Sequence, residues 1–153
     1  MKKYISLVLW ILGLLLMGSL MGAVTKAELD TWYSSLQRSP LTPPDYVFGI
    51  AWTILYVLIA LCGWMLWQQS ASRKLKTVFI AQLLLNWSWT PLFFYYHQVG
   101  LALVGLLFMD LLVAVMIYLS YPRMKGVSFL SVPYLAWLLF ATYLTFYIWR
   151  YNV

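Results

Sequence analysis

Long apolar stretches alternate with short polar ones along the whole chain. Each of five stretches is close to the roughly 20 residues that a helix needs to cross a bilayer. They are Tyr4–Val24, Asp45–Gln68, Val78–Tyr96, Leu101–Tyr121 and Phe129–Trp149. A backbone in lipid must satisfy its own hydrogen bonds, so these stretches are expected to be α-helices. The pattern predicts an all-α protein, in which residues 1–153 form one integral membrane domain of five transmembrane helices.

The first connection, residues 25–44, is much longer than the other three. Trp32, Tyr33 and Leu36 recur at helical spacing within it, which predicts a short helix over the mouth of the bundle. The prolines that follow hold the chain extended or start the next helix. This long, partly helical loop is therefore either an ordinary loop with aromatic anchors at the membrane surface or a lid over a cavity.

The first apolar stretch has two interpretations. Its start, MKKYISLVLWILGLLLMGSLMGA, resembles a secretory signal, with basic residues, an apolar run and small residues near Ala23. The apolar run exceeds the usual 7–15 residues of a signal, which favours a retained helix. Gly18 and Gly22 form a G-x-x-x-G pair, which lets another helix approach closely.

Composition excludes a water-soluble globule. Only 9% of the 153 residues are charged, against roughly 25% in a soluble domain. The net charge of +6 comes from short basic clusters between apolar runs, so nucleic-acid binding is not expected. The lone Cys62 excludes an intramolecular disulfide and is expected to pack. The chain has a single His and no Cys/His/Asp/Glu cluster with ligand spacing, so no metal site is expected.

Basic residues also predict an orientation in the membrane. Seven lie on the side shared by the N-terminus, the second loop and the fourth loop: Lys2, Lys3, Arg73, Lys74, Lys76, Arg123 and Lys125. Three lie on the opposite side: Lys26, Arg38 and Arg150. The asymmetry predicts a cytoplasmic N-terminus, with the first loop and the C-terminus outside.

Polar side chains interrupt the third apolar stretch at regular intervals. Gln82, Asn86 and Thr90 recur every four residues, on nearly one side of a helix. Buried amides usually face the interior of a bundle, so these are predicted to line a pocket. The alternative is that Asn86 only ties two helices together. Pro91 is expected to free the carbonyl near Trp87 and to kink the helix.

Aromatic residues recur at helical spacing in the second and fifth stretches. The positions are Pro44, Phe48, Trp52 and Tyr56, and then Tyr134, Trp137, Ala141 and Leu144. Plain packing explains most such stripes. However, Trp52 and Trp137 lie far from the interfaces where Trp collects. An indole N–H in hydrocarbon needs a partner, which Gln82 and Asn86 could provide.

Few other residues indicate chemistry. Asp110 is the only acid in the middle of an apolar stretch, and an intramembrane carboxylate is a functional candidate. It could equally be protonated and hydrogen-bonded for packing. His97 lies at the edge of a loop and is expected to be solvated. The sequence has no Ser–His–acid set, paired carboxylates or phosphate-binding loop.

Four ordered segments resemble the translocator protein family, also called tryptophan-rich sensory proteins (TspO). They are SPLTPPDYVFGIAWTILY, QLLLNWSWTPLFF, GLALVGLL and PYLAWLLFATYLTFYIWRYN. The resemblance runs from about Trp32 to Asn152, nearly the whole chain. It implies five transmembrane helices, often dimeric, with a cavity closed by the first loop.

The resemblance also implies ligands and a site. Family members bind protoporphyrin IX and haem, synthetic benzodiazepine-site ligands and, in several cases, cholesterol; no cofactor is required. Carried over by position, the ligand site comprises Trp32, Tyr33, Pro43, Phe48, Trp52, Tyr56, Asn86, Trp89, Trp137, Ala141 and Leu144. Some bacterial relatives degrade protoporphyrin in light, which implies a catalytic role for Trp52 and Trp137.

A sterol motif is only loosely satisfied. Leu144, Tyr147 and Arg150 fit the L/V-x-Y-x-K/R spacing, but the tyrosine is displaced by one position from the family pattern. Gly105 stands where relatives often have an acid, and Asp110 lies more than a turn away. The resemblance therefore assigns no functional role to Gly105 or to Asp110.

Three functions remain open from the sequence. The first is binding of a porphyrin or a related hydrophobic ligand for sensing, regulation or transport. The second is light- and oxygen-dependent degradation of that porphyrin. The third is a structural or assembly role in which the aromatic residues only pack. Binding is favoured, because stacking surfaces and amides suffice for it, whereas no general acid or base for turnover is evident.

Overall fold

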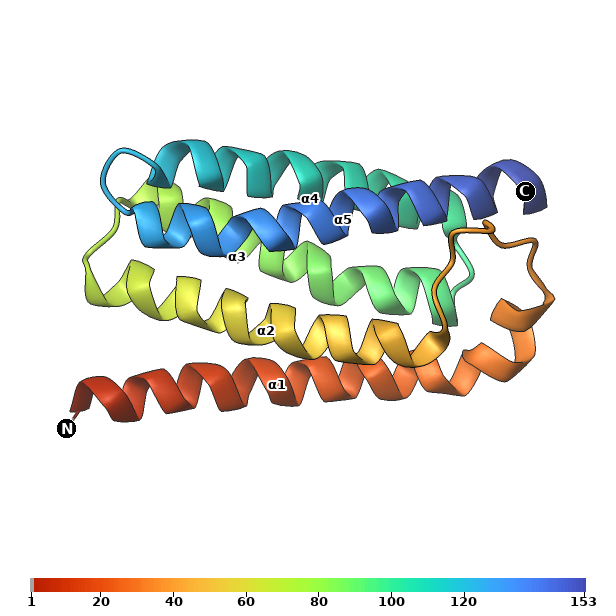
Figure 1. The fold of residues 1–153 in the computed structure, drawn as a ribbon, viewed down its shortest axis with the longest axis horizontal. Helices are drawn as coiled ribbons and strands as arrows, with labels where there is room; N and C mark the ends of the chain where they lie inside the picture. Colours follow the sequence, from red (N-terminus) through yellow and green to blue (C-terminus); the bar gives the residue numbers. More distant parts are fainter. Residues whose placement is uncertain (1) are drawn as a thin grey trace.

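The computed structural model describes residues 2–153, which form five α-helices and no strand (Figure 1). The helices are α1 (Lys2–Glu28), α2 (Asp45–Gln68), α3 (Arg73–Thr90), α4 (Val99–Ser120) and α5 (Lys125–Asn152). Two π-helical turns, η1 (Leu29–Tyr33) and η2 (Pro91–Tyr95), continue α1 and α3. The predicted all-α bundle is confirmed.

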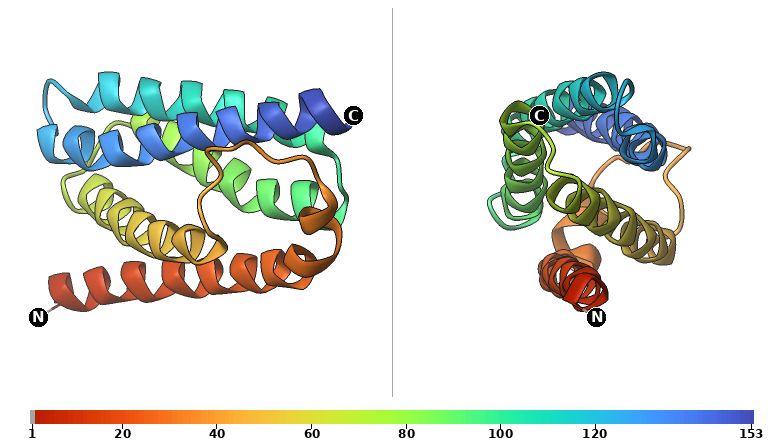
Figure 2. Two further views of the ribbon diagram at one scale, coloured as in Figure 1. Left: turned by 45° about the vertical axis from the view of Figure 1, so that its right-hand side comes forward. Right: turned by 90° about the vertical axis from the view of Figure 1, so that its left-hand side faces the viewer.

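The helices pack in the spatial order α1, α2, α5, α4, α3. Both α3 and η2 also contact α1, which closes the ring. The end-on view in Figure 2 shows α1 at the periphery. Most of its apolar side chains are exposed, whereas α2, α4 and α5 bury the side chains of the core. The largest fully buried residues include Tyr134, Phe79, Leu106, Met109 and Leu138.

Four of the helical segments described are long and apolar enough to cross a membrane. They are Lys3–Tyr33, Asp45–Gln68, Val99–Ser120 and Lys125–Asn152. The exception is α3, which begins with Arg73 and Lys74 and carries Gln82 and Asn86. Both amides are buried in the bundle. Because its neighbours shield these polar groups, α3 does not need to be uniformly apolar.

Only the second predicted span has the observed boundaries. The first helix continues through η1 to Tyr33, so the connecting segment is residues 34–44 rather than 25–44. Trp32 and Tyr33 are helical, as predicted, but they lie in the π-helical turn η1 that continues α1 and not in a helix separated from it. The third helix begins five residues earlier than predicted, at Arg73, because Ser72 caps it by accepting a hydrogen bond from the Leu75 N–H at 3.3 Å. The fourth and fifth helices begin at Val99 and Lys125.

The two ends of the bundle contain different connecting segments and chain termini. The start of α1, the turn 69–72 and the turn 121–124 lie at one end, and the segment 34–44 and the C-terminus lie at the other (Figure 1). The basic clusters that predict orientation therefore share one end of the molecule. Which end faces the cytoplasm stays a prediction.

Pro91 changes the path of the third helix. Proline has no backbone N–H to donate to the carbonyl of Trp87, so the α-helical ladder stops at Thr90. The chain widens into η2, in which the Tyr96 N–H donates to the Pro91 carbonyl at 2.9 Å. Phe93 and Phe94 are buried in this turn. The predicted disturbance at Pro91 is thus a π-helical turn.

Candidate functional site

Aromatic rings from α2 and α5 interleave along the seam between these helices. The ring centroids of Phe48 and Trp137 are 5.9 Å apart, and those of Trp52 and Tyr134 are 6.5 Å apart. Trp52 also lies 5.7 Å from Tyr56, one turn further along α2. We call these five residues the aromatic ladder. Trp52 and Trp137 are half-buried, so parts of both indoles stay accessible.

A chain of hydrogen bonds fixes the inner end of the aromatic ladder. The Tyr56 hydroxyl donates to Asn86 Oδ1 at 2.7 Å, and Asn86 Nδ2 donates to the Tyr134 hydroxyl at 3.0 Å. The Tyr134 hydroxyl then donates to Gln82 Oε1 at 2.9 Å. All four side chains are buried. They link α2, α3 and α5 through one polar network, which is costly to leave incomplete in a low-dielectric interior.

The predicted partners of the amides were therefore wrong in one respect. Gln82 and Asn86 face the interior as expected, but they bond to tyrosine hydroxyls and not to indoles. Within residues 2–153, the buried indole nitrogens of Trp87, Trp89 and Trp137 have no hydrogen-bond partner, nor does Gln82 Nε2. An unpaired buried donor costs about 1–3 kcal/mol. Trp137 is the one of these that belongs to the aromatic ladder.

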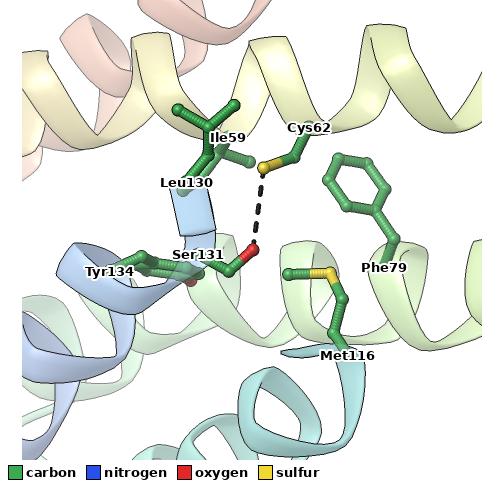
Figure 3. A pocket seen from close by; sticks show the side chains of 7 residues that line it. All are labelled: Ile59, Cys62, Phe79, Met116, Leu130, Ser131 and Tyr134. Carbon is green, nitrogen blue, oxygen red and sulfur yellow. Dashed lines mark hydrogen bonds between the residues drawn. The ribbon is translucent and has the colours of Figure 1, made fainter. Parts of the chain in front are cut away.

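The interior beyond Tyr134 is solid. A gap between α2, α3, α4 and α5 is lined by Ile59, Cys62, Phe79, Met116, Leu130, Ser131 and Tyr134, and it is too small for a water molecule (Figure 3). Cys62 Sγ lies 3.6 Å from Ser131 Oγ there. Cys62 is buried and packs, as predicted. This part of the interior has no room for a bound ligand.

A larger hollow lies at that end. Its volume is about 650 Å³, and its lining residues are Arg38, Ser39, Thr42, Pro43, Pro44 and Asp45. We call it the mouth hollow. Phe48, the outermost ring of the aromatic ladder, is one helical turn beyond Pro44. The mouth hollow therefore lies at the outer end of the ladder.

The segment 34–44 crosses to α5 and is tied to it (Figure 2). Ser39 Oγ and the Tyr143 hydroxyl are 2.9 Å apart. The backbone N–H of Gln37 donates to Asn152 Oδ1 at 2.8 Å, and Asn152 Nδ2 donates back to the Gln37 carbonyl at 3.0 Å. These bonds hold the segment against the C-terminal half of α5.

The remaining predicted ligand residues divide between two places. Pro43 lines the mouth hollow, and Ala141 and Leu144 follow Trp137 on α5, half-buried and buried respectively. Trp32, Tyr33 and Trp89 lie elsewhere, around Phe93 in η2. Their ring centroids are 5.3, 6.2 and 5.0 Å from that of Phe93. The predicted ligand set thus contains every residue of the aromatic ladder except Tyr134, together with residues of a second aromatic cluster around Phe93.

Two further predicted groups lie outside both clusters. Asp110 Oδ2 accepts a hydrogen bond from the Thr142 hydroxyl at 2.8 Å, which links α4 to α5. In the sterol motif, Leu144 is buried, Tyr147 is half-buried and Arg150 is exposed. These three therefore do not form one exposed surface. No three His, Cys, Asp or Glu side chains of the described residues are grouped to hold a metal ion.

Sequence reasoning missed the polar residues around the mouth hollow. Arg38 and Ser39 line the hollow, and Tyr143 and Asn152 bond the segment 34–44 to α5. The first two lie in an irregular segment and the other two do not share a face of α5, so no periodic spacing marks them. Tyr134 was part of the predicted stripe, but its place in the polar network depends on how α3 and α5 face each other. Only the packed structure supplies that information.

Comparisons with known proteins agree with the resemblance seen in the sequence. A sequence model of the TspO/MBR family matches residues 10–150. Tryptophan-rich protein TspO of Archaeoglobus fulgidus is 35% identical over 150 residues, which is 97% of each chain. The translocator protein of Homo sapiens is 36% identical over 79% of this chain and 75% of its own. The tryptophan-rich sensory protein of Cereibacter sphaeroides is 36% identical over 86% and 82%.

Proposed function

The chain belongs to the TspO/MBR family of membrane proteins, and from this premise we propose that it binds a porphyrin, such as protoporphyrin IX or haem, between α2 and α5. Binding serves a sensory or regulatory role in the membrane. The name of one relative, tryptophan-rich sensory protein, points the same way.

The aromatic ladder is the observation that carries the proposal. A flat, apolar macrocycle stacks on indole and phenyl faces, and each such contact adds about 0.5–1.5 kcal/mol beyond the burial of area. The half-buried rings of Trp52 and Trp137 offer such faces on opposite helices. Tyr56 and Tyr134 are held by the polar network and form a fixed floor beneath them.

The mouth hollow supports the same ligand class. Its volume of about 650 Å³ falls within the 300–1,000 Å³ typical of small-molecule sites. The solid interior near Cys62 excludes a deeper position. The ligand therefore occupies the outer part of the α2–α5 seam, beneath the segment 34–44.

A titration of the detergent-purified protein with protoporphyrin IX tests the proposal. Binding is followed by quenching of tryptophan fluorescence and by the shift of the porphyrin absorption band. Trp137→Ala removes one face of the ladder and is expected to weaken binding by about tenfold. Trp137→Phe keeps a ring but removes the indole N–H. The loss of affinity from wild type to Trp137→Phe therefore reports hydrogen bonding, and the further loss from Trp137→Phe to Trp137→Ala reports stacking.

Trp149→Ala is the matched control. This tryptophan also lies on α5, but it is exposed and contacts Phe146 rather than a ladder residue. It is expected to change the dissociation constant by less than about twofold. The proposal fails if wild-type protein binds no porphyrin, or if Trp137→Ala weakens binding no more than the corresponding Trp149→Ala does.

A further inference from the structure

One guanidinium group lies at the rim of the mouth hollow. The charged end of Arg38 is 5.1 Å from the centre of the Tyr33 ring, and Arg38 Nη1 is 3.7 Å from Asp45 Oδ1. Tyr33 is buried and ordered by Phe93 and Phe94. The buried tyrosine ring therefore supports the guanidinium group of Arg38, which lines the hollow.

The pairing of Arg38 with Asp45 is incomplete. A distance of 3.7 Å is longer than the 2.7–2.9 Å of a charge-assisted hydrogen bond. A guanidinium carries five N–H donors, and a bidentate carboxylate would use two of them. Both side chains are partly exposed, at 35% and 48%, so Asp45 holds Arg38 only weakly.

The negative charge of Asp45 is stabilised without Arg38. It is the first residue of α2, where the unpaired backbone N–H groups and the helix dipole favour a negative charge. A second carboxylate could thus replace Asp45 on the guanidinium while Asp45 stays at the helix N-terminus. The exchange leaves Arg38 paired throughout.

We propose that Arg38 binds the carboxylate of an amphipathic ligand whose flat apolar body lies on the aromatic ladder. This inference rests on the proposed porphyrin site and specifies its ligand class as a carboxylic acid rather than a neutral ring. The spacing fits such a ligand. Phe48 and Trp52 lie four and eight residues beyond Pro44, which is about 6 and 12 Å along the helix axis.

A pair of ligands that differ only in charge tests the inference. Protoporphyrin IX carries two carboxylates, and its dimethyl ester carries none. The dissociation constants of both are measured for wild type, Arg38→Gln, Asp45→Asn and Arg150→Gln. Because each variant is compared across the two ligands, differences in their partitioning into detergent cancel.

Arg38→Gln is expected to weaken binding of the acid by about tenfold and to leave ester binding within about twofold. Asp45→Asn removes the competing carboxylate, so it is expected to tighten binding of the acid by about threefold without changing the ester. Arg150→Gln is the control, because it removes the same charge from an exposed residue at the same end of the bundle. It is expected to affect neither ligand.

Each other outcome overturns the inference. If Arg38→Gln weakens binding of the acid and of the ester equally, Arg38 affects the conformation of the segment 34–44 and does not bind a carboxylate. The proposed porphyrin site is then still valid. If Asp45→Asn weakens binding of the acid, the ligand carboxylate does not replace Asp45 on Arg38, and the inference is wrong. If wild type binds neither ligand, the proposed function and the carboxylate site fail together. Retained ester binding by Arg38→Gln shows that the variant is folded.

Discussion

The Tyr134 hydroxyl is the centre of the polar network at the residue scale. It accepts from Asn86 Nδ2 and donates to Gln82 Oε1, and it also lies 3.7 Å from Met109 Sδ. One oxygen on α5 therefore bonds to two amides of α3, a helix that has few contacts with α5. No water is available to these amides in hydrocarbon, so Asn86 Nδ2 and Gln82 Oε1 depend on this hydroxyl for a hydrogen bond.

Tyr134→Phe tests that dependence. The variant keeps the ring but leaves one donor and one acceptor unpaired, so the free energy of unfolding is expected to fall by about 1–2 kcal/mol. Tyr118→Phe is the control, because Tyr118 is 78% exposed and its change is expected to stay within about 0.5 kcal/mol. Thermal unfolding in one detergent measures both. Equal midpoints for the two variants would show that the network contributes nothing to stability.

At the scale of elements, periodicity predicted the helices and which of their faces turn inward. It could not predict where α1 and α3 end. Those ends are π-helical turns, whose register depends on Pro91 and on the packing of Tyr33, Phe93 and Phe94 together. In the same way, the spacing of Phe48, Trp52 and Tyr56 indicated an aromatic face on α2. Which ring of α5 each one opposes is a property of two helices and not of either sequence.

The contact between α1 and α2 supplies a prediction at this scale. A Cβ added to Gly18 would lie 2.6 Å from Cδ2 of Tyr56, whereas one added to Gly22 would meet nothing within 4 Å. Only Gly18 of the G-x-x-x-G pair therefore mediates close approach within the molecule. Gly18→Ala is expected to lower the free energy of unfolding by about 1–3 kcal/mol, because Tyr56 must shift from its bond with Asn86.

Gly22→Ala is the matched control and is expected to act in the opposite direction. Its added methyl group meets no neighbour, and alanine is more favourable than glycine inside a helix by about 0.5–1 kcal/mol. The two variants are compared by thermal unfolding in the same detergent. Equal destabilisation by both would mean that Gly22 has a partner outside the chain, such as a second copy.

At the scale of the whole molecule, the segment 34–44 bridges helices that are distant in the sequence. The segment 34–44 joins α1 to α2, yet its side chains and backbone are bonded to α5. This arrangement ties the connection between the first two helices to the last one. Loosening the segment therefore requires its bonds to α5 to break.

Asn152→Ala is expected to loosen that segment. The substitution removes both hydrogen bonds to Gln37, and two such bonds at about 1 kcal/mol each correspond to an open population roughly thirtyfold larger. Arg38 follows Gln37 directly, and Ser39 is buried in the closed state at 4% exposure. Trypsin cleavage after Arg38 therefore reports opening, because cleavage follows the open population when closing is fast.

Cleavage after Arg123, at the opposite end of the bundle, serves as the internal control and is expected to keep its wild-type rate. The segment also provides a link to the ligand. If a porphyrin lies beneath residues 34–44, its presence must stabilise the closed state and slow cleavage after Arg38 alone, by a factor that rises with ligand concentration. A porphyrin that binds without protecting Arg38 lies elsewhere on the molecule, since no ligand can fill the mouth hollow and leave its lining equally open.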